Sequence, residues 1–212
     1  MLRIGLTGQT GAGKGAFCRY LLSAYGIPSI DADAVYHALL IPPSECVDAL
    51  VAEYGTGIHA PDGSVNRRAL APLVFGIPDP EARAAAIRRL NEITHPRVLQ
   101  EMRRIAGAHE GNGATAVVFD TPALFESGFD AECDLIVAVT ADRETRLSRI
   151  IARDGLTREQ AERRVNAQHP ESYYTSRADA VLRNDGTVAE FEAVAEAFCR
   201  ARLGLSGEGG AS

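Results

Sequence analysis

The segment Gly8–Lys14 reads Gly-Gln-Thr-Gly-Ala-Gly-Lys, a GxxxxGK pattern that is typical of phosphate-binding loops. Glycines let the backbone curl so that successive N–H groups point at phosphate oxygens, and the following helix N-terminus adds positive potential. Lys14 would reach the outer phosphates as a compact cation. The spacing predicts an ATP phosphate site, although three glycines alone would also suit a plain turn between a strand and a helix.

The composition strengthens this interpretation, because Lys14 is the only lysine among the 22 basic residues of the chain. One residue departs from the pattern. Position 15 is Gly15, where the full pattern has a Ser or Thr whose hydroxyl binds Mg²⁺. Ala16 also lacks a hydroxyl, and Thr10 lies on the other side of the loop. The loop therefore predicts phosphate binding but leaves the usual metal ligand missing.

Two further carboxylate positions follow apolar runs. Asp33, in Asp31-Ala32-Asp33, could accept a proton from an attacking hydroxyl, or it could cap the helix that begins nearby. Asp120 could orient Mg²⁺ directly or through water, or it could cap the turn at Pro122. The residues alone leave both pairs of alternatives open.

Short apolar runs alternate with helical patterns along the chain, which predicts an α/β fold with a parallel sheet covered by helices on both faces. Ligands of such sheets bind at the carboxyl ends of the strands, where the loop and these acidic residues lie. The expected strands are Leu2–Thr7, Ile27–Ile30, Ala116–Phe119, Leu135–Val139 and Ala180–Leu182. The expected helices are Lys14–Tyr25, several between Ala34 and His109, Arg143–Arg153, Thr157–Gln168 and Val188–Arg202.

Composition excludes several classes of protein. A net charge of −6 argues against a nucleic-acid partner. The four cysteines form no CxxC pair, so we expect neither a zinc site nor a disulfide framework. We find no signal-peptide core and no run of about 18 apolar residues that would span a membrane. The sequence thus predicts a cytoplasmic protein without a membrane partner.

Beyond the loop, the sequence resembles the dephospho-coenzyme A kinase family from about Leu2 to Phe191. The resemblance rests on the order and spacing of these motifs: Ile4–Gly8, Gly13-Lys14, Ile30–Asp33, Asp62-Gly63, Asn66–Leu70, Val74-Phe75, His95-Pro96, Asp120–Gly128, Arg149, Arg153–Thr157, Arg164, Gln168, Pro170, Ala178-Asp179 and Asn184–Gly186. It departs from the family at Gly15, and at Thr121 and Ala123, where the family usually has aliphatic residues.

The resemblance implies a P-loop kinase-like sheet of about five strands and a transfer of phosphate from ATP to the ribose 3′-hydroxyl of dephospho-CoA. It implies Mg²⁺ as cofactor, and the strand-end position of Asp120 predicts that residue as the metal ligand. It implies catalytic roles for Asp33 as base and for Lys14, Arg149 and Arg153. It implies ATP binding by Gly8, Gly11, Ala12, Gly13, Lys14, Gly15, Ala16, Arg149 and Asn184. It implies substrate binding by Asp33, Arg67, His95, Glu126 and Arg164. A packed or capping His95 is equally consistent with the residues themselves.

The same resemblance divides the chain. It predicts a nucleotide-binding core of residues 1–33, 114–142 and 178–203, a helical CoA-binding insertion of residues 34–113 and a lid of residues 143–177. Residues 204–212 are Gly/Ser-rich and predict a disordered tail. We expect a monomer or a weak oligomer.

The lid has independent physical support. Arg146, Arg149 and Arg153 are spaced i, i+3 and i+7, so they share one face of a helix. Guanidinium groups match phosphate oxygens well. The alternative is a solvated helix whose arginines pair with nearby acids such as Glu144 and Asp154.

Two other functions fit parts of the sequence. Another small-molecule P-loop kinase would share the loop but not the CoA-binding motifs. A nucleotide-binding module without catalysis would be favoured by Gly15 and opposed by Asp33 and Lys14.

Overall fold

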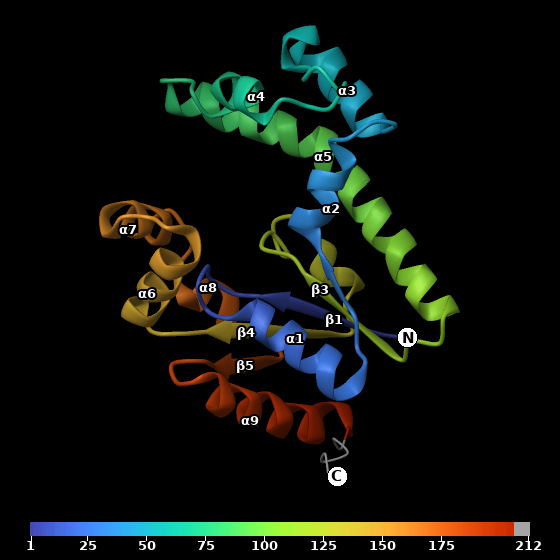
Figure 1. Ribbon diagram of the computed structural model, residues 1–212, viewed down its shortest axis with the longest axis vertical. Coiled ribbons are helices and arrows are strands. Elements are labelled where there is room, and N and C mark those ends of the chain that lie inside the picture. The colour runs from blue at the N-terminus through green and yellow to red at the C-terminus, as the bar shows by residue number, and fades with distance from the viewer. Residues whose placement is uncertain (206–212) are drawn as a thin grey trace. The chain divides into compact units, whose positions relative to one another are not determined.

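A five-stranded parallel sheet with the order β2-β3-β1-β4-β5 organises the computed structural model, which describes residues 1–205 (Figure 1). Leu6 of β1 is in register with Asp120 of β3 and with Val137 of β4, so the strand that leads into the glycine-rich loop is central. The strands are β1 Leu2–Thr7, β2 Ser29–Asp31, β3 Ala116–Asp120, β4 Leu135–Thr140 and β5 Ala180–Arg183. The predicted fold class is confirmed.

Helices α1 (Lys14–Tyr25) and α9 (Val188–Phe198) pack on one face of the sheet (Figure 1). The apolar run of β1 buries Ile4 and Leu6 completely against them. Phe17 of α1 and Phe198 of α9 meet edge to face, with ring centroids 5.8 Å apart. This core holds β1 and α1 in place, and with them the two ends of the loop between them.

Local sequence sets the limits of these helices. Gly26 ends α1 in the left-handed conformation, and its N–H donates to Leu22 O over 3.0 Å. Thr187 caps α9 through a capping box with Glu190. The last helix is shorter than predicted, because the α-helix ends at Phe198 and a π-helical turn, η3 (Cys199–Leu203), follows.

The predicted lid segment forms α6 (Arg143–Asp154), α7 (Arg158–Asn166) and α8 (Glu171–Thr175). Thr157 is the N-cap of α7 and forms a capping box with Gln160, so the helix starts one residue later than predicted. Leu147, Ile150, Ala161 and Val165 form a small apolar cluster that joins α6 to α7. A 3₁₀ turn, η2 (Phe129–Glu132), precedes β4.

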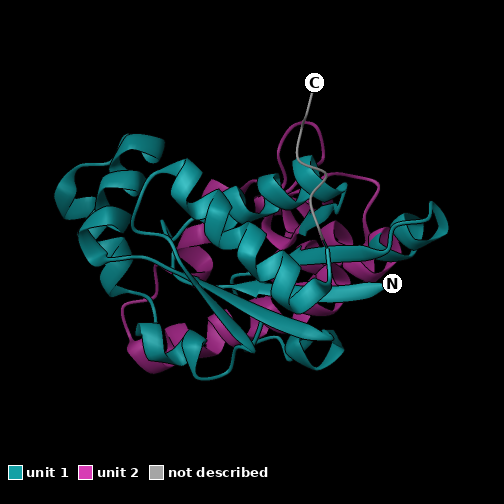
Figure 2. Cartoon of the chain, turned by 90° about the horizontal axis from the view of Figure 1, so that it is seen from below, with its two compact units in different colours: residues 1–30, 106–212 teal, residues 31–105 magenta. Residues whose placement is uncertain are grey.

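The chain divides into two compact units (Figure 2). Unit 1 consists of Met1–Ile30 and the chain from Ala106 onward, and unit 2 is Asp31–Ile105. Unit 2 has its own apolar core, which includes the fully buried Leu50 and Val74. Its helices are α2 Ala32–Leu39, α3 Glu45–Tyr54, η1 Thr56–Ile58, α4 Arg67–Val74 and the first part of α5 Pro80–Gly111. The functional division into core, insertion and lid stays a prediction.

Among residues 1–205, no helix combines the length and the apolar character that crossing a membrane requires. Of the predicted tail, Gly204 has φ +63° and Leu205 donates its N–H to Cys199 O over 3.2 Å. Residues 206–212, for which we predict disorder, lie outside the described residues.

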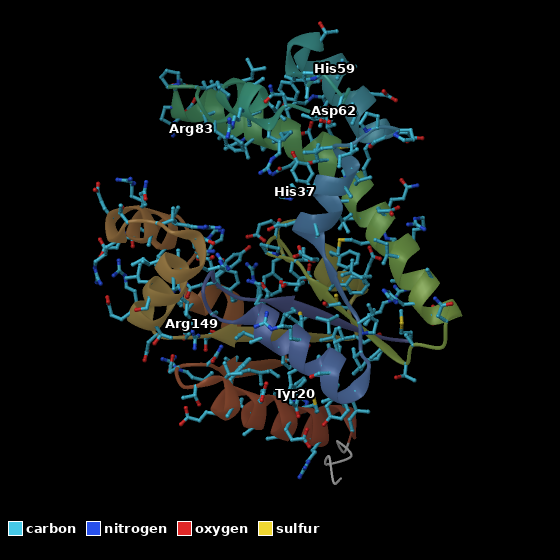
Figure 3. The ribbon with its side chains drawn as sticks, viewed as in Figure 1. Tyr20, His37, His59, Asp62, Arg83 and Arg149 are labelled. Atoms are coloured by element: carbon cyan, nitrogen blue, oxygen red, sulfur yellow. The ribbon has the colours of Figure 1, made fainter. Side chains whose placement is uncertain are left out.

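A hydrogen-bonded cluster around Glu196 joins α9 to α1. The hydroxyls of Tyr20 and Tyr25 both donate to Glu196 Oε2, and Arg200 Nε donates to Oε1 over 2.7 Å (Tyr20 is labelled in Figure 3). These donors, the Tyr20 hydroxyl first, lower the pKa of Glu196 from 4.5 to about 2. The charged carboxylate therefore contributes stability above its unfolded-state pKa, and that contribution is lost as the pH falls toward 2.

We predict that Glu196→Gln lowers the melting temperature at pH 7, because the neutral amide binds the two tyrosines and the arginine less strongly. The difference from the unmodified protein should narrow between pH 4.5 and about 2, where Glu196 takes up its proton. Thermal melts across this range check the prediction. A difference that stays constant with pH would mean that the charge of Glu196 does not stabilise the fold.

Candidate functional site

Three glycines of the loop adopt backbone conformations that other residues disfavour. Gly8, Gly11 and Gly13 have φ values of +132°, +78° and +109°. Gly13 is also the N-cap of α1, so the helix begins directly after the curled segment. A curled backbone at a helix N-terminus is the arrangement that presents N–H groups to an anion.

Close contacts also require glycine at these positions. A Cβ atom at Gly8 would lie 2.2 Å from Val139 O, and one at Gly11 would lie 2.7 Å from Arg146 O. One at Gly13 would lie 2.0 Å from Asn184 Nδ2. The loop thus packs against β4, α6 and the segment after β5 so closely that no side chain fits at these three glycines. Gly15 differs, because a Cβ there would meet only Arg19 Nη1, at 3.5 Å.

Lys14 turns back over the loop. Its Nζ donates to Gly8 O over 3.1 Å, so the ammonium group lies beside the first residue of the loop. The pattern predicts that this ammonium group binds the outer phosphates.

Arg149 and Asn184 meet at the second half of the loop (Arg149 is labelled in Figure 3). Asn184 is buried and donates from Nδ2 to Ala12 O over 2.8 Å. Arg149 donates from Nη1 to Asn184 O over 2.9 Å and to Ala12 O over 3.4 Å. The structure thus brings two predicted ATP-binding residues, from α6 and from the end of β5, onto the loop itself.

Arg146 contacts the first half of the loop, although the family resemblance implies no role for it in the site. Its guanidinium donates to Thr10 O over 3.0 Å, to Gln9 Oε1 over 2.5 Å and to Gln168 Oε1 over 3.3 Å. Gln168 Oε1 also accepts from Thr10 N over 2.9 Å. The shared helical face of Arg146 and Arg149 was the available signal, but it does not show which arginine is buried.

Three predicted site residues belong to unit 2. Asp33 lies in the first turn of α2 and is exposed, whereas Asp31 is the N-cap and accepts from Asp33 N and Ala34 N. The capping alternative for Asp33 is therefore wrong. Arg67 is exposed at the start of α4, and His95 is half-buried within α5.

Comparisons with known proteins decide the family. The sequence model for dephospho-CoA kinase matches residues 2–190. A dephospho-CoA kinase of Symbiobacterium thermophilum is 41% identical over 98% of this chain and 83% of its own length. A dephospho-CoA kinase of Corynebacterium efficiens is 38% identical over 92% of this chain and 94% of its own length. A crystal structure of a Thermus thermophilus protein has a TM-score of 0.73 at 33% identity, covering 97% of this chain and 98% of that one.

The chain belongs to the dephospho-CoA kinase family. It is therefore a kinase, and membership of this family implies ATP as a substrate. The predicted resemblance to this family is confirmed.

Two other predicted arginines of the dephospho-CoA kinase pattern bind a carboxylate instead of the loop. Arg153 makes two hydrogen bonds to Asp154, of 2.7 and 2.9 Å, and Arg164 Nη1 lies 2.6 Å from Asp154 Oδ2. Both arginine side chains are at least half exposed, so packing does not fix their positions. The catalytic role of Arg153 and the substrate-binding role of Arg164 stay predictions.

The remaining predicted residues of unit 1 are Asp120 and Glu126. Asp120 is the last residue of β3 and is half-buried. Glu126 is exposed, and its Oε1 lies 3.5 Å from His169 Nε2. The His169 ring stacks on Tyr173 with centroids 4.0 Å apart. Neither the metal role of Asp120 nor the substrate role of Glu126 follows from these contacts.

We predict that Gly8→Ala destabilises the protein by at least about 2 kcal/mol and abolishes measurable nucleotide binding. The physical reason is the positive φ together with the collision with Val139 O, a backbone atom that cannot move aside. Gly15→Ala is the matched control, since it adds the same methyl group to the same segment where space is open. Chemical denaturation and ADP titration check both variants. Equal effects of the two substitutions would contradict the role given to the Gly8 backbone.

Proposed function

We propose that this chain transfers the γ-phosphate of ATP to the ribose 3′-hydroxyl of dephospho-CoA, giving CoA and ADP in the last step of coenzyme A biosynthesis. The observation that carries the proposal is the packed glycine loop with Lys14 and Arg149, in a chain of the dephospho-CoA kinase family. We expect the reaction to take place in the cytoplasm.

The loop would bind ATP through its triphosphate. Backbone N–H groups of the curled segment and the N-terminus of α1 favour negative charge, and Lys14 adds a mobile cation. On binding, Lys14 Nζ would exchange its contact with Gly8 O for phosphate oxygens. Transfer of the phosphoryl group requires that the reacting groups be positioned and that the charge of the transition state be stabilised. The loop N–H groups and Lys14 would contribute to both.

Asp33 is the proposed general base. Its carboxylate would accept the proton of the ribose hydroxyl while the hydroxyl oxygen forms a bond to the γ-phosphorus. The bond from that phosphorus to the bridging oxygen breaks, and ADP leaves with the electron pair. The role of Asp31 supports this proposal. Because Asp31 caps α2, the Asp33 carboxylate is not needed as the cap and could act as the base.

Mg²⁺ would accompany ATP and neutralise charge on its β- and γ-phosphates. The residues fit this ion only in part. Asp120 supplies a carboxylate at a strand end, but Gly15 supplies no hydroxyl, and residues 1–205 contain no group of three acidic, His or Cys side chains that could hold a metal. We therefore propose that the ion is bound chiefly by the phosphates, with Asp120 nearby.

A coupled assay of purified protein with Mg-ATP and dephospho-CoA tests the proposed function. We expect ADP and CoA as stoichiometric products. A panel of nucleoside monophosphates and nucleosides serves as the control, and greater turnover on any of these would show a different small-molecule kinase. ATP binding without turnover on any acceptor would instead show a nucleotide-binding module.

We predict that Asp33→Asn lowers kcat by roughly 10²- to 10⁴-fold, the usual contribution of a general base, with little change in ATP affinity. Asp31→Asn is the matched control, because its side-chain oxygen can still cap α2. Steady-state kinetics and ATP titration check both variants. Near-normal turnover of the Asp33 variant would exclude it as the base.

We predict that Gly15→Ser raises the apparent affinity for Mg²⁺ severalfold, which corresponds to a gain on the order of 1 kcal/mol or less in binding free energy. We expect no loss of folding stability. The side chain fits, because position 15 has a helical backbone and open space. Gly15→Ala separates the effect of the hydroxyl from that of the added carbon. Mg²⁺ titrations of ADP binding and of turnover check it, and equal midpoints for all three proteins would mean that another group already fills this role.

A further inference from the structure

The phosphate loop of this chain has outward-facing carbonyl groups that need donors. When N–H groups of a curled backbone converge on one point, neighbouring carbonyl oxygens face away from it, and buried carbonyls require hydrogen bonds. Arg149 and Asn184 meet this need at Ala12 O. Arg146 meets it at Thr10 O, two residues earlier.

Arg146 is buried to an unusual degree for a charged side chain. Only 4% of its surface is exposed. Its Nε, Nη1 and Nη2 atoms each donate a hydrogen bond, so the planar guanidinium connects the loop backbone, Gln9 and Gln168 at the same time. A lysine ammonium in this place could not match three acceptors that are spread around a planar fork.

The acceptors of Arg146 are all neutral: one backbone carbonyl and two amide side chains. The other arginines of this segment mostly pair with acids, since Arg153 and Arg164 bind Asp154 while Arg158 binds Glu144 and Glu162. Burial of a charge without an ion-pair partner is costly. Burial accordingly lowers the pKa of Arg146, partly offset by the more distant Glu171 carboxylate. A cost of this kind is understandable where an anion is bound nearby.

The backbone of α6 is also in direct contact with the loop. The Cβ position of Gly11 lies 2.7 Å from Arg146 O and 3.0 Å from Arg146 Cα. Gln168, which follows α7, accepts from both Arg146 and Thr10 N. Arg146 therefore joins three separate segments: the loop, the first turns of α6, and the chain between α7 and α8.

We infer that Arg146 is a positioning residue of the phosphate loop, which holds the loop in its anion-binding shape and keeps an unneutralised positive charge beside it. The inference rests on the proposed function only in that ATP is the ligand of the loop. It assigns no contact with the acceptor substrate. It also makes the first turns of α6 a fixed part of the phosphate site, so that any lid movement must involve the segment beyond them.

The first test compares Arg146→Lys and Arg146→Gln with Arg143→Gln as matched control. Arg143 lies on the same helix and is exposed. It donates to Asn166 Oδ1 over 3.2 Å and forms an ion pair with Glu144 at 3.7 Å, in place of contacts with the loop. Calorimetric titration with ADP, titration with dephospho-CoA and thermal melts are measured for each protein. We expect both Arg146 variants to lose on the order of tenfold or more in ADP affinity, with dephospho-CoA affinity within about twofold of normal.

Unchanged ADP affinity of the Arg146 variants would overturn the inference. An equal loss for ADP and dephospho-CoA would also overturn it, because that pattern indicates general loss of structure. The Arg146→Lys variant keeps the positive charge but loses the planar guanidinium. Normal ADP affinity of this variant would overturn the positioning role given to the guanidinium.

Gln168→Glu provides a second test that does not depend on removing a buried arginine. The carboxylate can accept from Thr10 N and Arg146 as the amide does, but it neutralises the guanidinium. We expect an equal or higher melting temperature together with an ADP affinity that is lower by on the order of tenfold. Unchanged ADP affinity would contradict the inferred role of the charge.

These measurements remain separate from the test of the proposed function, because ADP binding needs no acceptor. If the Arg146 and Gln168 variants behave as expected while dephospho-CoA is not phosphorylated, the proposed substrate is wrong and the inference stands. If dephospho-CoA is phosphorylated while the variants bind ADP normally, the inference alone fails.

Discussion

The phosphate loop depends on the pairing of its backbone carbonyls. A backbone that curls to aim N–H groups at an anion leaves carbonyl oxygens on its outer side, and these require donors from the surrounding protein. Arg146 supplies the donor for Thr10 O, and Asn184 with Arg149 supplies those for Ala12 O. Such an arrangement keeps the loop in shape before a nucleotide arrives, which reduces the ordering that binding would otherwise require.

The close fit of the loop follows from the same requirement. Donors can reach the outer carbonyls only if α6 and the chain after β5 approach the backbone closely, and this leaves no space for side chains at Gly11 and Gly13. The glycines thus serve two needs together, the positive φ values and the approach of neighbouring segments. Gly15 has neither need, because it lies within α1 and a Cβ atom there would meet only Arg19 Nη1, at 3.5 Å.

Charge is distributed unevenly within this acidic chain. The exposed arginines Arg153, Arg158 and Arg163 of α6 and α7 form ion pairs with carboxylates, so that the two charges of each pair offset one another. Arg146 and Arg149 instead bind neutral carbonyl and amide oxygens next to the loop. The arrangement concentrates positive potential where phosphates would bind, although the net charge of the protein is −6.

The sequence by itself determined the fold class, the phosphate loop and the family. Each of these depends on local patterns: alternating apolar runs, glycine and lysine spacing, and the order of short motifs. The limits of α1, from Lys14 to Tyr25, also follow from local residues, because Gly13 and Gly26 mark its ends. The first strand has the predicted bounds, and the ends of the other four differ from the predicted ones by at most two residues.

The tertiary structure decided which arginine contacts what. Arg146, Arg149 and Arg153 are equivalent in the helical pattern, yet the first is buried under the loop, the second bonds to Asn184 and the third pairs with Asp154. Helical spacing cannot distinguish them, because their environments come from segments distant in sequence, such as Gln9 and Gln168. The choice of Asp31 over Asp33 as helix cap likewise depends on where the backbone leaves its extended conformation, which two nearby aspartates do not reveal.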